Sequence, residues 1–137
     1  MIQWLFLLLL QSYVLTPERA IPVEASDFTV DALGNIYLVY DYHLEKLAPD
    51  GKVLYRSSDL GYGRIHRIDV SNPLKPFLYY QDQNVIINLD NTLSQQGNAI
   101  DLREFDFTMV ELAGASRDNC YWLWDSPRSA LIRTDKT

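Results

Sequence analysis

Cysteine, histidine and clustered positive charge are all scarce in this chain of 137 residues. The single cysteine, Cys120, excludes an intrachain disulfide, so packing alone must hold the fold. No run of Lys or Arg is present, and the formal net charge is -6 at pH 7. We therefore expect no nucleic acid partner, because binding a polyanion needs clustered cations.

The rare reactive side chains do not form a catalytic signature. His43 and His66 have no Ser or Cys nucleophile motif beside them, and we interpret both as surface or rim residues. Cys120 takes the repeat position of the apolar Ile36, which predicts a small buried side chain. No cofactor loop is present either, so we expect neither a cofactor nor a resident metal.

A long apolar run occurs only near the N-terminus, from Trp4 to Leu10. This run is shorter than the ~20 residues that cross a bilayer, so no stable membrane span is expected. We predict that residues 1–25 are a signal peptide cleaved before Ser26, because Val23 and Ala25 offer small side chains at the required positions. A signal peptide implies export to the periplasm, the cell envelope or the medium. The alternative is that these residues form a buried N-terminal helix or strand.

Short alternating strands dominate the rest of the sequence, which has the 47% hydrophobic and 22% charged content of a folded domain. Apolar alternation predicts a strand over residues 36–40, and neighbouring strands are expected at 28–30, 44–48 and 52–56. Turn signals separate them, including Pro49-Asp50-Gly51. Four strands are therefore predicted in about 30 residues.

The same order recurs further along the chain. Strands are expected at about 64–70, 77–81 and 85–89, and again at 108–115, 120–124 and 130–133. The second strand of each unit ends in an aspartate, and these aspartates are Asp41, Asp82 and Asp125, 41 and 43 residues apart. A period of about 42 residues with four strands per unit is typical of β-propeller blades. The predicted fold is all-β, with units at about 26–60, 61–104 and 105–137.

The stretch "VDALGNIYLVYDYHLEKLAPDG", residues 30–51, resembles an NHL-type blade. The shared features are an Asp-x-x-Gly turn, an Asn-Ile-Tyr second strand ending in Asp, and a closing Pro-Asp-Gly. "IDVSNPLKP", residues 68–76, is similar to a turn of another secreted propeller repeat, and the whole resembles six-bladed propeller proteins of the bacterial cell envelope. The third unit departs from the pattern, with Asp118 where the first has glycine. The resemblance implies a fold and no particular activity.

The repeat count predicts an incomplete ring. Six blades need roughly 250 residues, whereas this sequence holds two full units and three strands of a third. We expect the chain to be the N-terminal part of a larger propeller or to close with a second copy.

Three groups of residues are candidate binding sites with structural alternatives. The aspartates Asp41, Asp82 and Asp125 would hold a cation on one rim, but turn-forming roles are favoured. Residues 90–101 have the length of a calcium loop, but their glycine is at the eighth position, which favours a plain connector. Tyr121, Trp122 and Trp124 offer a stacking surface, although blade core is favoured.

Two functional hypotheses remain open. The leading one is an exported, non-enzymatic propeller whose loops bind a protein or a glycan. The alternative is half of a lactonase-type propeller hydrolase with a metal on the central axis. Its candidate ligands on or beside first strands are Asp31, Asp69 and Glu111.

Overall fold

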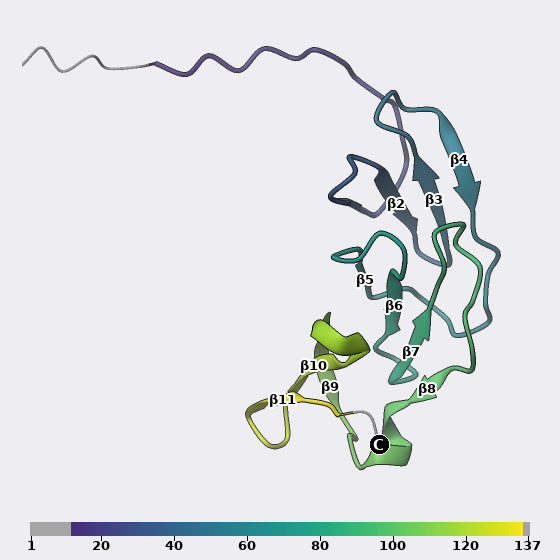
Figure 1. Ribbon diagram of the computed structural model, residues 1–137, viewed down its shortest axis with the longest axis vertical. Coiled ribbons are helices and arrows are strands. Elements are labelled where there is room, and N and C mark those ends of the chain that lie inside the picture. The colour runs from purple at the N-terminus through teal and green to yellow at the C-terminus, as the bar shows by residue number, and fades with distance from the viewer. Residues whose placement is uncertain (1–11, 136–137) are drawn as a thin grey trace, which may run out of the picture.

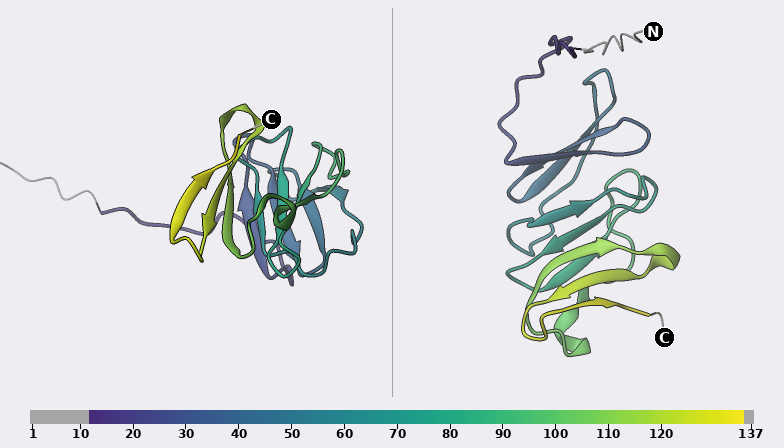
Figure 2. Two further views of the ribbon diagram at one scale, coloured as in Figure 1. Left: turned by 90° about the horizontal axis from the view of Figure 1, so that it is seen from below. Right: turned by 90° about the vertical axis from the view of Figure 1, so that its left-hand side faces the viewer.

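The structure, a computed structural model, describes residues 12–135 (Figure 1). Three antiparallel sheets stand one beside the next along the chain (Figure 2). Residues 12–25 precede them without regular secondary structure. The apolar run from Trp4 to Leu10 lies outside the described residues, so signal cleavage stays a prediction. No helix within residues 12–135 is long and apolar enough to cross a membrane.

Each sheet is one blade, and its strands follow each other in chain order. Blade 1 consists of β1 (Asp27–Val30), β2 (Ile36–Tyr40), β3 (His43–Leu47) and β4 (Val53–Arg56). Blade 2 consists of β5 (Arg67–Asp69), β6 (Phe77–Tyr80), β7 (Val85–Asn88) and β8 (Ile100–Asp101). Blade 3 consists of β9 (Val110–Ala115), β10 (Tyr121–Asp125) and β11 (Ala130–Arg133). The predicted fold class, an open and incomplete set of propeller blades, is confirmed.

Some boundaries differ from the expectation. The strand predicted to begin at 64 begins at Arg67, and the short β8 follows a connector of mixed polar residues. Two 3-10 turns, η1 (Leu102–Phe105) and η2 (Arg117–Asn119), occupy segments where no helix was predicted. The β3–β4 turn agrees with its sequence signal, because Gly51 has a φ of 88° that other residues adopt only with strain.

Successive side chains along a strand point to opposite faces of a sheet, so every blade has two faces. We call the face toward the preceding blade face A and the face toward the following blade face B. At the first junction, face B of blade 1 packs on face A of blade 2 through Tyr37, Val39, Leu44, Ile68, Leu78, Tyr80 and Ile87. At the second junction, face B of blade 2 packs on face A of blade 3 through Phe77, Tyr79, Ile86, Val110, Ala113 and Leu123.

Hydrogen bonds also cross both junctions. The Lys46 Nζ of blade 1 donates to the carbonyl oxygen of Asn91 in blade 2, at 3.0 Å. The Tyr121 hydroxyl of blade 3 donates to Asn88 Oδ1 of blade 2, at 2.7 Å. Because buried polar groups are costly without partners, these bonds require each blade to sit in one position relative to the next.

Candidate functional site

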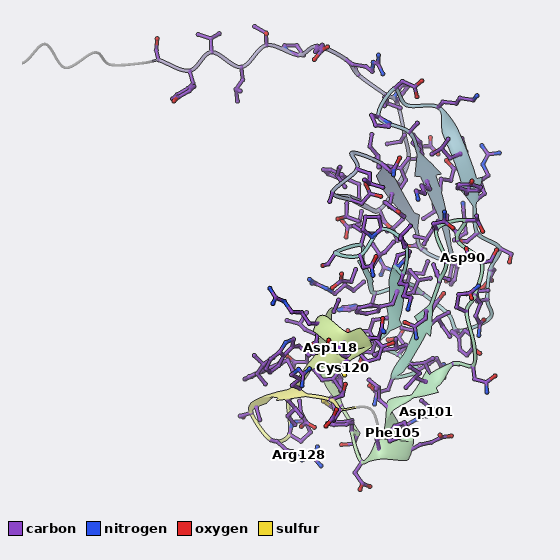
Figure 3. The ribbon with its side chains drawn as sticks, in the orientation of Figure 1. Asp90, Asp101, Phe105, Asp118, Cys120 and Arg128 are labelled. Atoms are coloured by element: carbon purple, nitrogen blue, oxygen red, sulfur yellow. The ribbon has the colours of Figure 1, made fainter. Side chains whose placement is uncertain are left out.

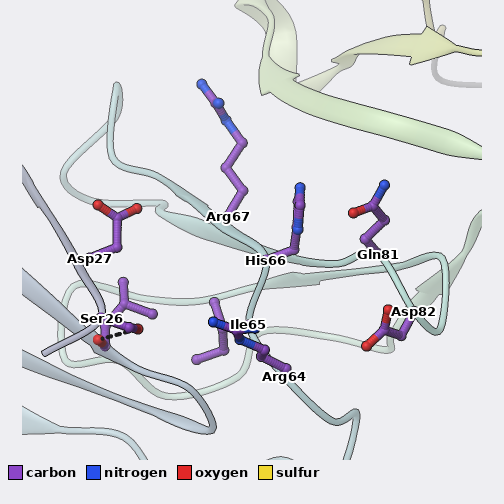
Figure 4. Close-up of a pocket in the computed structure, with 9 residues that line it drawn as sticks. Ser26, Asp27, Arg64, Ile65, His66, Arg67, Gln81 and Asp82 are labelled. Atoms are coloured by element: carbon purple, nitrogen blue, oxygen red, sulfur yellow. Dashed lines mark hydrogen bonds between the residues drawn. The ribbon is translucent and has the colours of Figure 1, made fainter.

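A cavity of about 350 Å³ lies where the first strands of blades 1 and 2 begin (Figure 4). Four segments build it: the start of β1, strand β2, the chain leading into β5, and the β6–β7 turn. The lining residues are Ser26, Asp27, Val39, Arg64, Ile65, His66, Arg67, Gln81 and Asp82.

The segment leading into β5 is held to both blades by its backbone. The N–H of Ile65 donates to the Asp41 carbonyl oxygen at 2.6 Å, and the N–H of His66 donates to the Tyr79 carbonyl oxygen at 2.9 Å. The Ile65 side chain is buried in the first junction, and the His66 ring packs edge-on against Tyr79 at 6.2 Å between ring centres. The cavity therefore rests on a rigid wall.

Polar groups without protein partners gather at this cavity. Among the described residues, the side chains of Arg67, Gln81 and Asp82 make no hydrogen bond and no ion pair (Figure 4). The Arg67 guanidinium supplies donors, the Asp82 carboxylate supplies acceptors, and the Gln81 amide supplies both. Such a set suits a ligand dense in hydroxyl or amide groups.

The cavity does not hold an activated nucleophile. The Ser26 hydroxyl donates to the Val39 carbonyl oxygen at 2.9 Å, within blade 1. In the part of the chain that the structure describes, no imidazole or carboxylate hydrogen-bonds to that hydroxyl. A hydroxyl needs an adjacent base to act as a nucleophile, whereas the Ser26 hydroxyl is hydrogen-bonded to a backbone carbonyl oxygen.

The three acidic residues predicted for an axial metal site are not brought together. Asp69 Oδ2 accepts a hydrogen bond from the Ala115 N–H at 2.7 Å, across the second junction. Glu111 Oε1 accepts one from the Ser126 hydroxyl at 2.7 Å within blade 3. Asp31 lies in the β1–β2 turn. Within residues 12–135, no group of three or more His, Cys, Asp or Glu side chains is arranged to hold a metal.

Asp31 is the anchor of its turn. Its carboxylate accepts hydrogen bonds from the N–H groups of Leu33 and Asn35, each at 2.9 Å, and from the Tyr37 hydroxyl at 3.0 Å. Burial raises the pKa of Asp31, but these hydrogen bonds, together with one from the Asn35 side chain, outweigh it and hold the pKa below its usual value. Burial and the bond to Asp31 raise the pKa of the Tyr37 hydroxyl.

The three evenly spaced aspartates lie in different environments. Asp41 is exposed in the β2–β3 turn and pairs with Arg64 at 3.0 Å. Asp82 is exposed in the β6–β7 turn and lines the cavity. Asp125 is buried at the end of β10, where it accepts hydrogen bonds from the Arg128 N–H at 3.0 Å and from its guanidinium at 2.5 Å.

Each of the remaining candidate residues either packs within the fold or is exposed on its surface. His43 is exposed at the start of β3, and its ring stacks on Tyr40 with 4.8 Å between ring centres. Cys120 is buried, as expected. Tyr121 packs edge-on against Phe77 in the second junction, at 5.3 Å. Trp122, expected in the core, is exposed on face B of blade 3, because no following blade covers that face within the described residues.

Of residues 90–101, the first ten lie in the connector between β7 and β8, and the last two are β8 itself (Figure 3). Asp90 Oδ1 accepts hydrogen bonds from the Thr92 hydroxyl at 2.7 Å and from the Ser94 N–H at 2.9 Å. These bonds hold the pKa of Asp90 below its usual value. The carboxylate is thus engaged in ordering its own loop.

Sequence reasoning missed Arg67 and Gln81. The basic cluster at residues 64–67 was a visible signal, since three of its four residues are Arg or His. The spacing of residues does not reveal that the β6–β7 turn comes to lie beside the start of β5.

Sheets of three or four antiparallel strands, arranged as successive blades, define this chain as part of a β-propeller that is not closed. The crystal structure of selenomethionine-substituted virginiamycin B lyase from Staphylococcus aureus is similar, with a TM-score of 0.53 at 12% sequence identity. The similarity covers 78% of this chain and 39% of that chain, so the matched part is well under half of that protein. No family model and no curated protein sequence matches the chain. At this identity the likeness establishes the fold alone.

Proposed function

We propose that this chain is the ligand-binding part of an exported, non-enzymatic β-propeller of the six-bladed, NHL-like kind found in bacterial cell envelopes. The observation that carries the proposal is the cavity beside β5, where Arg67, Gln81 and Asp82 have no protein partners among the described residues. Polar side chains held on a rigid wall without partners are what a polar ligand requires.

A glycan fits this site better than a protein surface does. The cavity volume of about 350 Å³ is at the lower end of the range for small-ligand sites. A stable protein interface would bury about 800 Å² on each partner, over a much wider surface. The donors of Arg67 and Gln81 and the acceptors of Gln81 and Asp82 also match the hydroxyl groups of a sugar, which both donate and accept.

Catalysis is not part of the proposal. The fold neighbour is named a lyase, but here the Ser26 hydroxyl is bonded to a backbone carbonyl. The hydrolase alternative needs several acidic ligands around one metal, whereas Asp31, Asp69 and Glu111 each hydrogen-bond elsewhere.

The binding site is tested by screening the purified chain on a glycan array and by parallel capture of cell-surface proteins. We expect glycan binding that Arg67→Ala and Asp82→Asn each weaken by about tenfold or more, as expected when a charged hydrogen bond is lost. Arg117→Ala is the matched control, because Arg117 is an exposed arginine in η2, away from the cavity. Unchanged binding by both cavity variants would refute the site, and capture of a protein without glycan would refute the ligand class.

Export is tested separately. Mass spectrometry of the protein from its native host should find a new N-terminus near Ser26, because Val23 and Ala25 match the positions read by signal peptidase. Recovery of intact Met1 from the cytoplasm would contradict export.

A further inference from the structure

The ionised side chains that line the cavity beside β5 do not balance. Its carboxylates belong to Asp27 and Asp82, and its guanidinium groups belong to Arg64 and Arg67. Arg64 already pairs at 3.0 Å with Asp41, which is not among the lining residues. Two carboxylates and only one guanidinium are therefore left without an ion-pair partner among the described residues. This excess of negative charge attracts a positively charged group.

Asp82 differs in this respect from the aspartates at the ends of the second strands of blades 1 and 3. Asp41 pairs with Arg64, and Asp125 accepts a hydrogen bond from the Arg128 guanidinium at 2.5 Å. Within residues 12–135, no lysine or arginine forms an ion pair with Asp82. Of the three aspartates, the one in blade 2 is thus the one without a cation.

The following part of blade 2 offers no arginine for this role. Asp41 and its partner are 23 residues apart, and the same spacing from Asp82 leads to Phe105. Arg103, close to Phe105 in sequence, pairs with Asp101 at 2.6 Å. A cation that pairs with Asp82 therefore has to come from outside the described residues.

We propose that Asp82 binds a positively charged amine of the ligand, so that the preferred glycan contains amino sugars whose amines are free. The inference rests on the proposed function, because it narrows the class of glycan that the same cavity binds. An ammonium group donates three hydrogen bonds, and an ionised carboxylate only accepts them. Hydrogen bonds between two ionised groups are stronger than those between neutral groups.

The other side chains without partners suit the uncharged part of such a sugar. The Arg67 guanidinium donates to hydroxyl oxygens, and the Gln81 amide both donates and accepts. Gln81 and Asp82 are neighbours in the β6–β7 turn, whereas Asp27 lies at the opposite end of the lining side chains (Figure 4). An acetylated amine is neutral, so a sugar of that kind would leave both carboxylates without a cation.

Calorimetric titration of the purified full chain with two matched oligosaccharides tests the inference. One is a glucosamine tetramer with free amines, and the other is the same tetramer with every amine acetylated. At about pH 7 an amine is largely protonated and a histidine largely neutral at their usual pKa values. At low salt we expect the free-amine tetramer to bind about threefold tighter or more. Added salt should reduce the difference, because Asp82 is exposed and its charge is screened.

Two variants separate the cavity from the overall charge of the chain, which is -6. Asp82→Asn keeps the shape of the side chain but removes its charge, and we expect this variant to bind both tetramers equally. Glu104→Gln is the matched control, because it makes the same change in net charge at an exposed residue of η1 that does not line the cavity. The control should keep the preference of the wild type.

Equal affinities of the wild type for the two tetramers, or tighter binding of the acetylated one, would overturn this inference and leave glycan binding itself standing. A preference that persists in Asp82→Asn, or that Glu104→Gln removes, would also overturn it, because overall charge would then be the cause. Failure of both tetramers to bind would overturn it as well, and the glycan array then decides whether the proposed function falls with it.

Discussion

Blade 2 and blade 3 are built on the same repeat, yet their strands have different burial patterns. All four residues of β6 are buried, because blades 1 and 3 cover both faces of that sheet. In β10, the equivalent strand of blade 3, Leu123 is buried whereas Trp122 is exposed and Trp124 is half-buried, because only face A has a neighbour within the described residues. Burial in a repeat array is therefore set by the position of the unit in the array as much as by its own sequence.

The largest expected effect comes from truncating the equivalent aromatic residues of the two blades. Phe77→Ala should lower the free energy of unfolding by about 3–5 kcal/mol, because it leaves a cavity in the second junction. Trp122→Ala should cost less than half as much, since Trp122 is partly exposed. Urea unfolding measures the free energy of unfolding of both variants. Equal costs would mean that face B of blade 3 is covered within a single chain.

A smaller effect is expected from removing one hydroxyl group at the second junction. The Tyr79 hydroxyl lies 2.6 Å from the Val110 carbonyl oxygen, to which it donates, and 2.9 Å from Asn84 Oδ1. Tyr79→Phe should destabilise the chain by about 1–3 kcal/mol, because buried acceptors lose their donor. Tyr42→Phe is the control, since Tyr42 is exposed in the β2–β3 turn. If both variants unfold at the same urea concentration, the junction does not depend on this bond.

The smallest effect is expected from removing the charge of Asp31, whose carboxylate orders the β1–β2 turn of blade 1. Because hydrogen bonds lower the pKa of Asp31 in the folded chain, the ionised carboxylate stabilises the fold above the unfolded value of 3.8. This stability is lost as pH falls through the folded pKa. Asp31→Asn should therefore be less stable than the wild type at pH 7, and the difference should shrink below pH 3.8. A difference that is independent of pH would show that charge plays no part.

The strands of blades 1 and 2 were predictable because their signals are local. The strand over residues 36–40 and the turns at Asp31 and Gly51 are encoded by residues close together in the sequence. The structure places this strand and both turns where they were expected. β8 was not predictable, because two residues paired to β7 after a polar connector have no periodicity to detect. Arg67 and Gln81 were missed for a related reason, since the cavity exists only when two distant segments meet.

By itself the amino-acid sequence determined the repeat: an all-β chain of short strands, tight turns at set intervals and an incomplete number of blades. These follow from backbone geometry and side-chain alternation, which act over a few residues. Only the tertiary structure decided which of the equivalent residues became core, cavity or uncovered face. Tyr37, Phe77 and Trp122 occupy the same position in their blades, but the first two are buried and the third is not. Burial depends on what packs against a sheet from outside it, and no pattern within one repeat carries that information.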